Sequence, residues 1–279
     1  MTRKKPERKS GITTESALTA PVKAVGDALG AFFGFLGETA RIFTATLILI
    51  LRGKINIRDT VNLMASIGVS SLPIVAVTVM FSGGVISLYL AQIVVKWGFG
   101  SYTGAVVGIS VVREIAPILT AVVVAARAGS AIAAEISSMK VTEQIDALKA
   151  LAVNPLEYLA VPRMVAAVLT LPMLAMMADV AGVFGGYYVA IANKVASGGF
   201  IATFEAMVTP RDITMGLIKT LFFAVVIVTV AVQQGLRVEG GAAGVGKATT
   251  NTVVLSIVII YILNFILAYV MFNGGPAVG

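Results

Sequence analysis

The stretch VVREIAPILTAVVVAARAGSAIAAE, residues 111–135, decides the fold class. It is mostly apolar and is longer than the roughly 20 residues with which an α-helix crosses the hydrocarbon core of a bilayer. Arg113 and Glu114 lie well inside it, where each charge costs roughly 2.5–3.5 kcal/mol and normally faces a cavity or a partner. Adjacent helical residues point about 100° apart, so these two are not expected to pair with each other. Arg113 can hold an anionic headgroup, or each residue can bond elsewhere in a helical bundle.

The composition of the whole chain agrees with a membrane protein. Of 279 residues, 58% are hydrophobic and 13% are charged, with a mean hydropathy of +0.95. Soluble domains carry about 25% charged residues. The chain has no Cys and no His, which excludes disulfides, thiolate chemistry, histidine general bases and nearly every zinc site. We therefore expect no catalytic residue and no metal site.

Five segments are long and apolar enough to span a membrane. Their ranges are 67–95, 104–134, 159–192, 213–232 and 252–272. They form a predicted permease domain over 59–273. An earlier segment, 22–58, is interrupted by Asp27, Glu38 and Arg41 and has a clean apolar run only at 42–51. Such short runs favour an interfacial amphipathic helix, here at the cytosolic face, with a sixth span as the alternative. Residues 1–21 are expected to be a disordered basic cytosolic tail, and residues 274–279 a short external tail.

The basic residues orient the predicted spans. Ten of the 21 lysines and arginines precede Asp59. With five spans and a cytosolic N-terminus, Lys140 and Lys149 also lie inside, whereas Lys194 and Lys219 are assigned to outer loops and their edges. This asymmetry follows the positive-inside rule and places the C-terminus outside. The net charge of +7 is thus explained by topology and does not call for nucleic acid.

The stretch GAAGVGKATT, residues 241–250, resembles a nucleotide-binding P-loop, but Ala248 breaks the pattern. A working P-loop follows a β-strand in a soluble α/β domain, and here the stretch lies between two predicted spans. We expect a flexible glycine-rich turn before a helix, with Thr249, Thr250 or Asn251 near its cap.

A short amphipathic helix is predicted at about 141–153, between the second and third spans. Ile145 and Leu148 recur at helical spacing, and charged residues occupy other positions. Thr142 is placed to cap this helix, and Asn154 with the following proline is placed to end it. Such a helix can dock a soluble partner and pass its motion to two spans, or it can simply rest on the membrane surface.

The first span contains Pro73 and the pair Gly83-Gly84, which suggest a kinked or locally opened helix. If it opens a groove, Ile86, Ile93 and Val94 can contact acyl chains. Otherwise they face bulk lipid.

In the third span, Asp179 is an isolated acid for which a buried hydrogen bond is the simplest role and proton or cation binding the alternative. Gly182 and Gly186 form a GxxxG helix-packing signal.

Two long motifs resemble one known family. Residues 113–163, from REIAPILTAV to NPLEYLAVPR, are similar to the signature region of the MlaE/YrbE permeases, the membrane subunits of MCE-type ABC transporters that move lipids between membranes. Residues 240–254, GGAAGVGKATTNTVV, are similar to the same family's turn into its last span. The resemblance extends over about 22–272.

The resemblance implies an all-α integral membrane protein with an N-terminal interfacial helix, five transmembrane helices and a short cytosolic coupling helix. It implies a cytosolic ABC ATPase that binds the ATP and Mg, so that this chain has no cofactor of its own. A periplasmic MCE-domain protein and a second permease copy are the other implied partners. The intact motif EQIDAL, residues 143–148, favours a homodimer in the inner membrane.

Site residues also follow from the resemblance. The implied lipid contacts are Ile86, Ile93, Val94, Trp97, Arg113 and Glu114. The implied contacts with the ATPase are Glu143, Gln144, Asp146, Leu148 and Lys149. The function expected is that of a lipid-transporting permease, with phospholipids as the expected cargo. Two alternatives remain open: a proton- or ion-coupled secondary transporter that uses Glu114 and Asp179, and a passive membrane anchor for MCE proteins.

Overall fold

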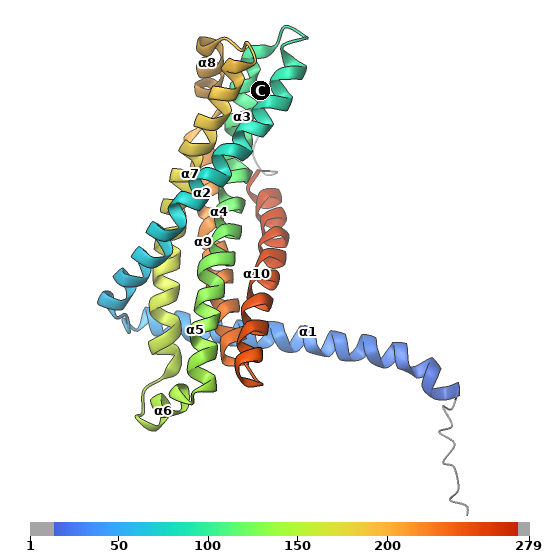
Figure 1. Cartoon of the computed structure of the whole chain (residues 1–279), viewed down its shortest axis with the longest axis vertical. Helices are drawn as coiled ribbons and strands as arrows, with labels where there is room; N and C mark the ends of the chain where they lie inside the picture. Colours follow the sequence, from blue (N-terminus) through green and yellow to red (C-terminus); the bar gives the residue numbers. More distant parts are fainter. Residues whose placement is uncertain (1–13, 273–279) are drawn as a thin grey trace, which may run out of the picture. The chain divides into compact units, whose positions relative to one another are not determined.

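The computed structural model describes residues 14–272, which contain helices and no strand (Figure 1). The α-helices are α1 (Thr14–Leu51), α2 (Ile57–Val94), α3 (Thr103–Ser110), α4 (Ala116–Val124), α5 (Ser130–Val141), α6 (Gln144–Ala150), α7 (Pro155–Ala192), α8 (Ser197–Met207), α9 (Pro210–Leu236) and α10 (Gly241–Phe272). Helices in six places are long and apolar enough to cross a membrane. The chain is an all-α integral membrane protein.

The chain divides at Arg41 into two units. The first unit contains the beginning of α1, and this helix starts at Thr14, earlier than the boundary of 22 that we expected. The predicted disordered tail, 1–21, is therefore wrong for residues 14–21, which are helical. Its residues 1–13 and the predicted external tail, 274–279, lie outside the described residues. The segment Phe33–Leu51 has the length and composition of a membrane span, so the position of α1 at the membrane surface stays a prediction.

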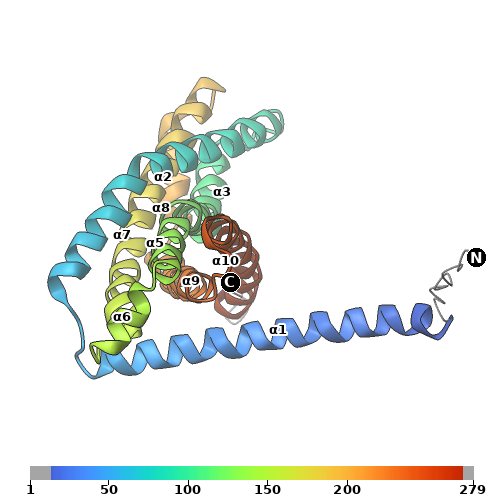
Figure 2. The same ribbon diagram turned by 60° about the horizontal axis from the view of Figure 1, so that its bottom comes forward.

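The second unit is a helical bundle. The most extensive helix–helix contact is between α2 and α7, while α5, α9 and α10 pack on one another (Figure 2). The span Gly100–Val141 is not one regular α-helix, because two π-helical segments, η2 (Val111–Ile115) and η3 (Ala125–Gly129), interrupt it. π-turns inside α-helices occur frequently at functional sites.

Glycines let α2 and α7 approach each other closely. A Cβ atom on Gly83 would collide with the carbonyl oxygen of Gly182, and one on Gly185 would collide with the carbonyl oxygen of Met80. The suggestion that α2 is locally opened at Gly83 and Gly84 is wrong, since α2 is continuous there and Gly83 serves packing. A kink in α2 stays a prediction. Gly182 does pack against another helix, as its GxxxG motif predicted.

Two further differences from expectation concern α10 and α8. α10 begins at Gly241, so most of the stretch expected to be a flexible turn is helical. Gly240 and Gly241, both at positive φ, turn the chain into the start of α10, and the alanines that follow are strong helix formers. The second difference is α8, for which no helix was expected. It packs on α3, where Gly104 and Gly108 leave room for Phe200 and Phe204.

Candidate functional site

Arg113 and Glu114 both lie in the π-helical segment η2. Pro117 follows one turn later and has no N–H to donate to the carbonyl oxygen of Arg113, which an α-helix would require. The side chain of Lys219 replaces that donor, with Nζ 2.9 Å from the Arg113 oxygen. A lysine of α9 thus completes the backbone hydrogen bonding of this span.

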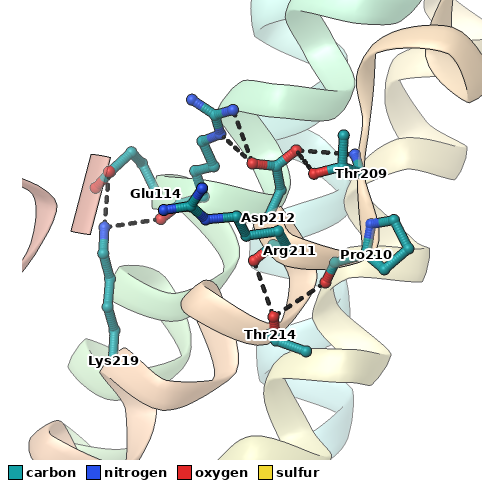
Figure 3. Close-up of polar contacts among 8 residues, drawn as sticks. Glu114, Thr209, Pro210, Arg211, Asp212, Thr214 and Lys219 are labelled. Atoms are coloured by element: carbon teal, nitrogen blue, oxygen red, sulfur yellow. Dashed lines mark hydrogen bonds and ion pairs between the residues drawn. The ribbon is translucent and has the colours of Figure 1, made fainter. Parts of the chain in front are cut away.

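The two charged residues of η2 have separate partners, as their angular separation predicted. Arg113 donates from Nε to Oδ1 of Asp212 at 2.7 Å. Lys219 donates to Oε1 of Glu114 at 2.7 Å (Figure 3). Asn264 of α10 donates to Oε2 of Glu114 at 2.9 Å. The site therefore contains two ion pairs between η2 and α9, and a hydrogen bond joins α10 to the same centre.

Asp212 is held by the start of its own helix. Its Oδ2 accepts hydrogen bonds from the backbone N–H and the hydroxyl of Thr209, each at 2.8 Å, in a capping box at the first turn of α9 (Figure 3). A carboxylate is stabilised at a helix N-terminus. Thr209 thus fixes the position of the Asp212 carboxylate. The guanidinium of Arg113 binds this carboxylate.

Lys219, which the charge count assigned to the outer loops and their edges, lies inside α9 and is buried in the bundle. Its side chain is 0% exposed. The ring of Phe272 lies 4.6 Å from the Arg113 guanidinium carbon and 5.3 Å from Lys219 Nζ, distances at which a cation is attracted by an aromatic face. The signal that could have located this site was a lone lysine inside the apolar segment 213–232.

A pocket of about 490 Å³ lies against Glu114. Ile86 of the predicted lipid contacts lines it as well. The remaining walls are apolar except for Ser82 and Tyr261, and they come from α2, η2, α4 and α10. The other wall residues are Phe81, Val85, Ile115, Ile118 and Leu119. The structure therefore brings one predicted apolar contact and one predicted charged residue to a single pocket.

The other predicted lipid contacts do not line this pocket. Ile93 and Trp97 are exposed, at 59% and 75%, at the end of α2 and in the turn after it. Val94 is half-buried there. Arg113 does not line the pocket either, because its guanidinium is directed to Asp212.

The predicted coupling helix is α6, a short helix with one buried residue, Ile145. Residues in the left-handed conformation flank it, Glu143 before and Ala152 after, each at φ 59°. The prediction that Thr142 caps α6 is wrong, since its hydroxyl donates to the Ser138 carbonyl at the end of α5. Asn154 likewise does not end α6, because it caps α7 by accepting from the Leu156 N–H.

The predicted ATPase contacts lie on and beside α6. Glu143, Gln144, Asp146 and Lys149 are exposed, and Leu148 is half-buried. A hydrogen bond from Lys149 and the positive charges of Lys140 and Lys149 lower the pKa of Asp146, so this carboxylate stays ionised at neutral pH. The structure places these residues together on one exposed turn.

The ends of α5 and α7 on either side of α6 are tied together. Arg163 of α7, which is buried, forms an ion pair with Glu135 of α5 at 2.7 Å. Ile145 lies in the same hydrophobic core as Ile132 and Leu159. α6 is thus attached to the bundle on both sides.

Comparison with known proteins identifies the family. The model of the family Permease MlaE matches residues 60–270. The chain is 40% identical over 226 residues to the probable ABC transporter permease protein slr1045 of Synechocystis sp., covering 81% of this chain and 86% of the relative. It is 39% identical over 208 residues to the probable ABC transporter permease protein RP096 of Rickettsia prowazekii, covering 74% and 80%. It is 34% identical over 226 residues to the chloroplastic protein TRIGALACTOSYLDIACYLGLYCEROL 1 of Arabidopsis thaliana, covering 81% and 65%. The chain belongs to the MlaE permease family.

Proposed function

We propose that this ABC transporter permease moves lipids and that the pocket beside Glu114 receives the lipid. The observation that carries the proposal is an apolar pocket with a charged, fully partnered group at its wall. An amphiphile needs such a combination of apolar and polar surface. The Arabidopsis relative supports a lipid cargo, because its name includes the glycolipid trigalactosyldiacylglycerol. A phospholipid is the cargo that we expect.

Of the two residues expected at the polar end of the lipid site, Glu114 lines the pocket and Arg113 does not. Arg113 is committed to Asp212, so the pocket presents Glu114, whose charge Lys219 balances. Because Glu114 is 37% exposed and both its oxygens accept hydrogen bonds, it contributes a polar but neutralised surface. A lipid headgroup therefore meets a balanced ion pair rather than an isolated charge.

We further propose that a separate cytosolic ATPase binds ATP and Mg and docks on α6. The exposed contacts are Glu143, Gln144, Asp146, Leu148 and Lys149. A displacement of α6 would reach the spans through Ile145 and the Glu135–Arg163 ion pair. A ligand or partner shifts an equilibrium only by binding two states differently, so the ATPase must favour one position of α6 over another.

The remaining assignments rest on the resemblance to the family. We propose a homodimer in the inner membrane, with the N-terminus in the cytosol, the C-terminus in the periplasm and an MCE-domain protein on the periplasmic side. Glu114 and Asp179 line different pockets, which gives no support to a proton relay between them.

Co-purification tests the proposed function. The tagged permease is extracted in mild detergent, and the bound proteins and lipids are identified by mass spectrometry. An ABC ATPase and a defined lipid should be recovered. A permease that is recovered without any ATPase, and whose transport follows an ion gradient, would contradict the proposal.

A pair of substitutions on one helix locates the lipid. Ile86→Trp fills the pocket and should reduce the co-purified lipid by about tenfold, since a blocked pocket loses its apolar contacts. Ile93→Trp is the matched control, because Ile93 lies two turns further along α2, is exposed and does not line the pocket. Equal lipid content in both variants would show that the lipid binds elsewhere.

A further inference from the structure

We propose that a second site, a groove between α7 and α8, binds an amphiphile that has one apolar chain and a protonated amine as its head, and that Asp179 binds the amine. This groove is distinct from the Glu114 pocket, and the inference does not depend on which lipid is transported.

The groove has a volume of about 540 Å³ and a nearly continuous apolar wall. α7 contributes Val180, Val183 and Phe184, and α8 contributes Ile201 and Phe204. Asp179 is the one charged residue among its lining residues. A groove of this kind combines a surface for a hydrocarbon chain with a single fixed point for a polar head.

The α8 wall is held in place, so the groove exists before any ligand binds. Phe200 packs edge-on against Tyr187 of α7, with 5.4 Å between ring centroids. The Thr203 hydroxyl donates to the Ser101 carbonyl at 2.5 Å. The backbone of α8 lies close to Gly104, where no larger residue fits. A preformed site binds more tightly because little ordering is needed on binding.

The carboxyl group of Asp179 lacks a partner. Its Oδ1 is buried and has no hydrogen-bond partner among residues 14–272, and Asp179 forms no ion pair with them. The other hydrogen-bonding side chain of the groove, Tyr187, is already paired, with its hydroxyl 3.0 Å from Ser197 Oγ. An acidic side chain in an apolar span normally has a partner, and no basic residue lines the groove. A protonated amine supplies both the missing positive charge and the missing hydrogen-bond donors.

The size of the groove favours a chain-shaped ligand over a helix from a partner protein. A helix is about 10–12 Å across with its side chains. A volume of about 540 Å³ holds little more than one turn of such a helix, yet it falls in the range of pockets that take small ligands.

Photolabelling of the full chain tests the site. The probe is a sixteen-carbon primary amine with a diazirine next to its head, and the comparison probe is the corresponding alcohol. Labelled peptides are mapped by mass spectrometry, and folding of each variant is checked by size-exclusion chromatography and thermal unfolding. The amine should label α7 and α8 around the groove, and Asp179→Asn should lower that labelling about tenfold, because a charge-assisted hydrogen bond is lost.

Two further variants keep the test decisive. Ile201→Trp narrows the groove without altering Asp179 and should also lower labelling. Met177→Trp is its control, because Met177 is exposed on α7 but does not line the groove.

Equal labelling by the amine and the alcohol, or full labelling of Asp179→Asn, would overturn the proposal. Labelling that disappears in the complex purified from membranes would also overturn it, by showing that a partner protein occupies the groove. Variants of Ile86 should not alter this labelling, so failure of this proposal and failure of the lipid pocket remain distinguishable.

Discussion

At the scale of single residues, the site depends on one lysine that makes two different interactions. Lys219 satisfies the carbonyl oxygen of Arg113, which Pro117 leaves without its helical donor, and it neutralises Glu114. The unsatisfied carbonyl oxygen and the Glu114 carboxylate both belong to η2, and a side chain of α9 binds both of them. The result is a polar centre whose two positive and two negative charges balance, as charges inside a membrane protein require.

Removal of Lys219 should therefore destabilise the protein more than removal of an exposed charge. We expect Lys219→Met to lower the free energy of unfolding by about 3 kcal/mol, the lower end of the range for breaking a buried pair, because Glu114 is partly exposed. Thermal unfolding in detergent measures the change.

The control is a double variant. Lys219→Met combined with Glu114→Gln removes both charges and should recover part of the lost stability, since no unpaired carboxylate remains. If the double variant is as unstable as the sum of the single variants, the pair does not act as we describe.

The sequence could predict half of this network. Charges inside an apolar run marked Arg113 and Glu114, and helical geometry showed that they do not pair with each other. Their partners are 99 and 105 residues away along the chain, and no local pattern connects residues so far apart. Lys219 carried a signal of its own, but counting charges for topology assigned it to a loop edge.

At the scale of helices, α6 has the properties of a docking element. It is short, it is bounded by two residues in the left-handed conformation, and Ile145 is its one buried residue. Non-glycine residues adopt that conformation at some energetic cost. The backbone therefore breaks sharply on both sides, which sets a rigid exposed turn between α5 and α7.

Charge reversal on α6 tests its proposed role in coupling. Glu143→Lys should lower the lipid-stimulated ATPase activity of the reconstituted complex by about tenfold or more, because a misplaced charge at an interface costs several kcal/mol. The permease itself should stay folded, since Glu143 is exposed and has no ion pair within residues 14–272.

The matched control for this variant is Glu205→Lys, the same reversal at an exposed position of α8. In the bundle, α8 and α6 lie at opposite ends (Figure 1). Unchanged activity in Glu143→Lys, or an equal loss in both variants, would count against docking on α6.

Helix boundaries illustrate where sequence patterns are insufficient. The apolar segments located the spans, but the helices extend past them, as α2 does by starting at Ile57 and α10 by starting at Gly241. The polar residues at the starts of α2 and α10 are helical because each continues, without a break, into a helix that packs in the bundle. The glycines of α2 were misjudged for a related reason: their role depends on the backbone of α7, which lies far away in the sequence.

At the scale of the whole molecule, the distribution of charge predicts its orientation in the membrane. Lys140 and Lys149 flank or belong to α6, and the positive-inside rule places them in the cytosol. Because α8 lies at the other end of the bundle (Figure 1), the same rule places α8 on the opposite side of the membrane. This assignment also determines which face is available to a cytosolic ATPase.

The absence of cysteine from the sequence makes the orientation directly measurable. Single variants Glu143→Cys and Glu205→Cys, at exposed positions of opposite ends, can be treated with a membrane-impermeant maleimide in spheroplasts. Glu205→Cys should react in intact spheroplasts, because the predicted topology places α8 on the periplasmic side. Glu143→Cys should react only after the membrane is disrupted, a step that also shows both thiols to be reactive. The reverse pattern would invert the topology, move α6 away from the cytosol and thereby remove the surface on which the proposed ATPase docks.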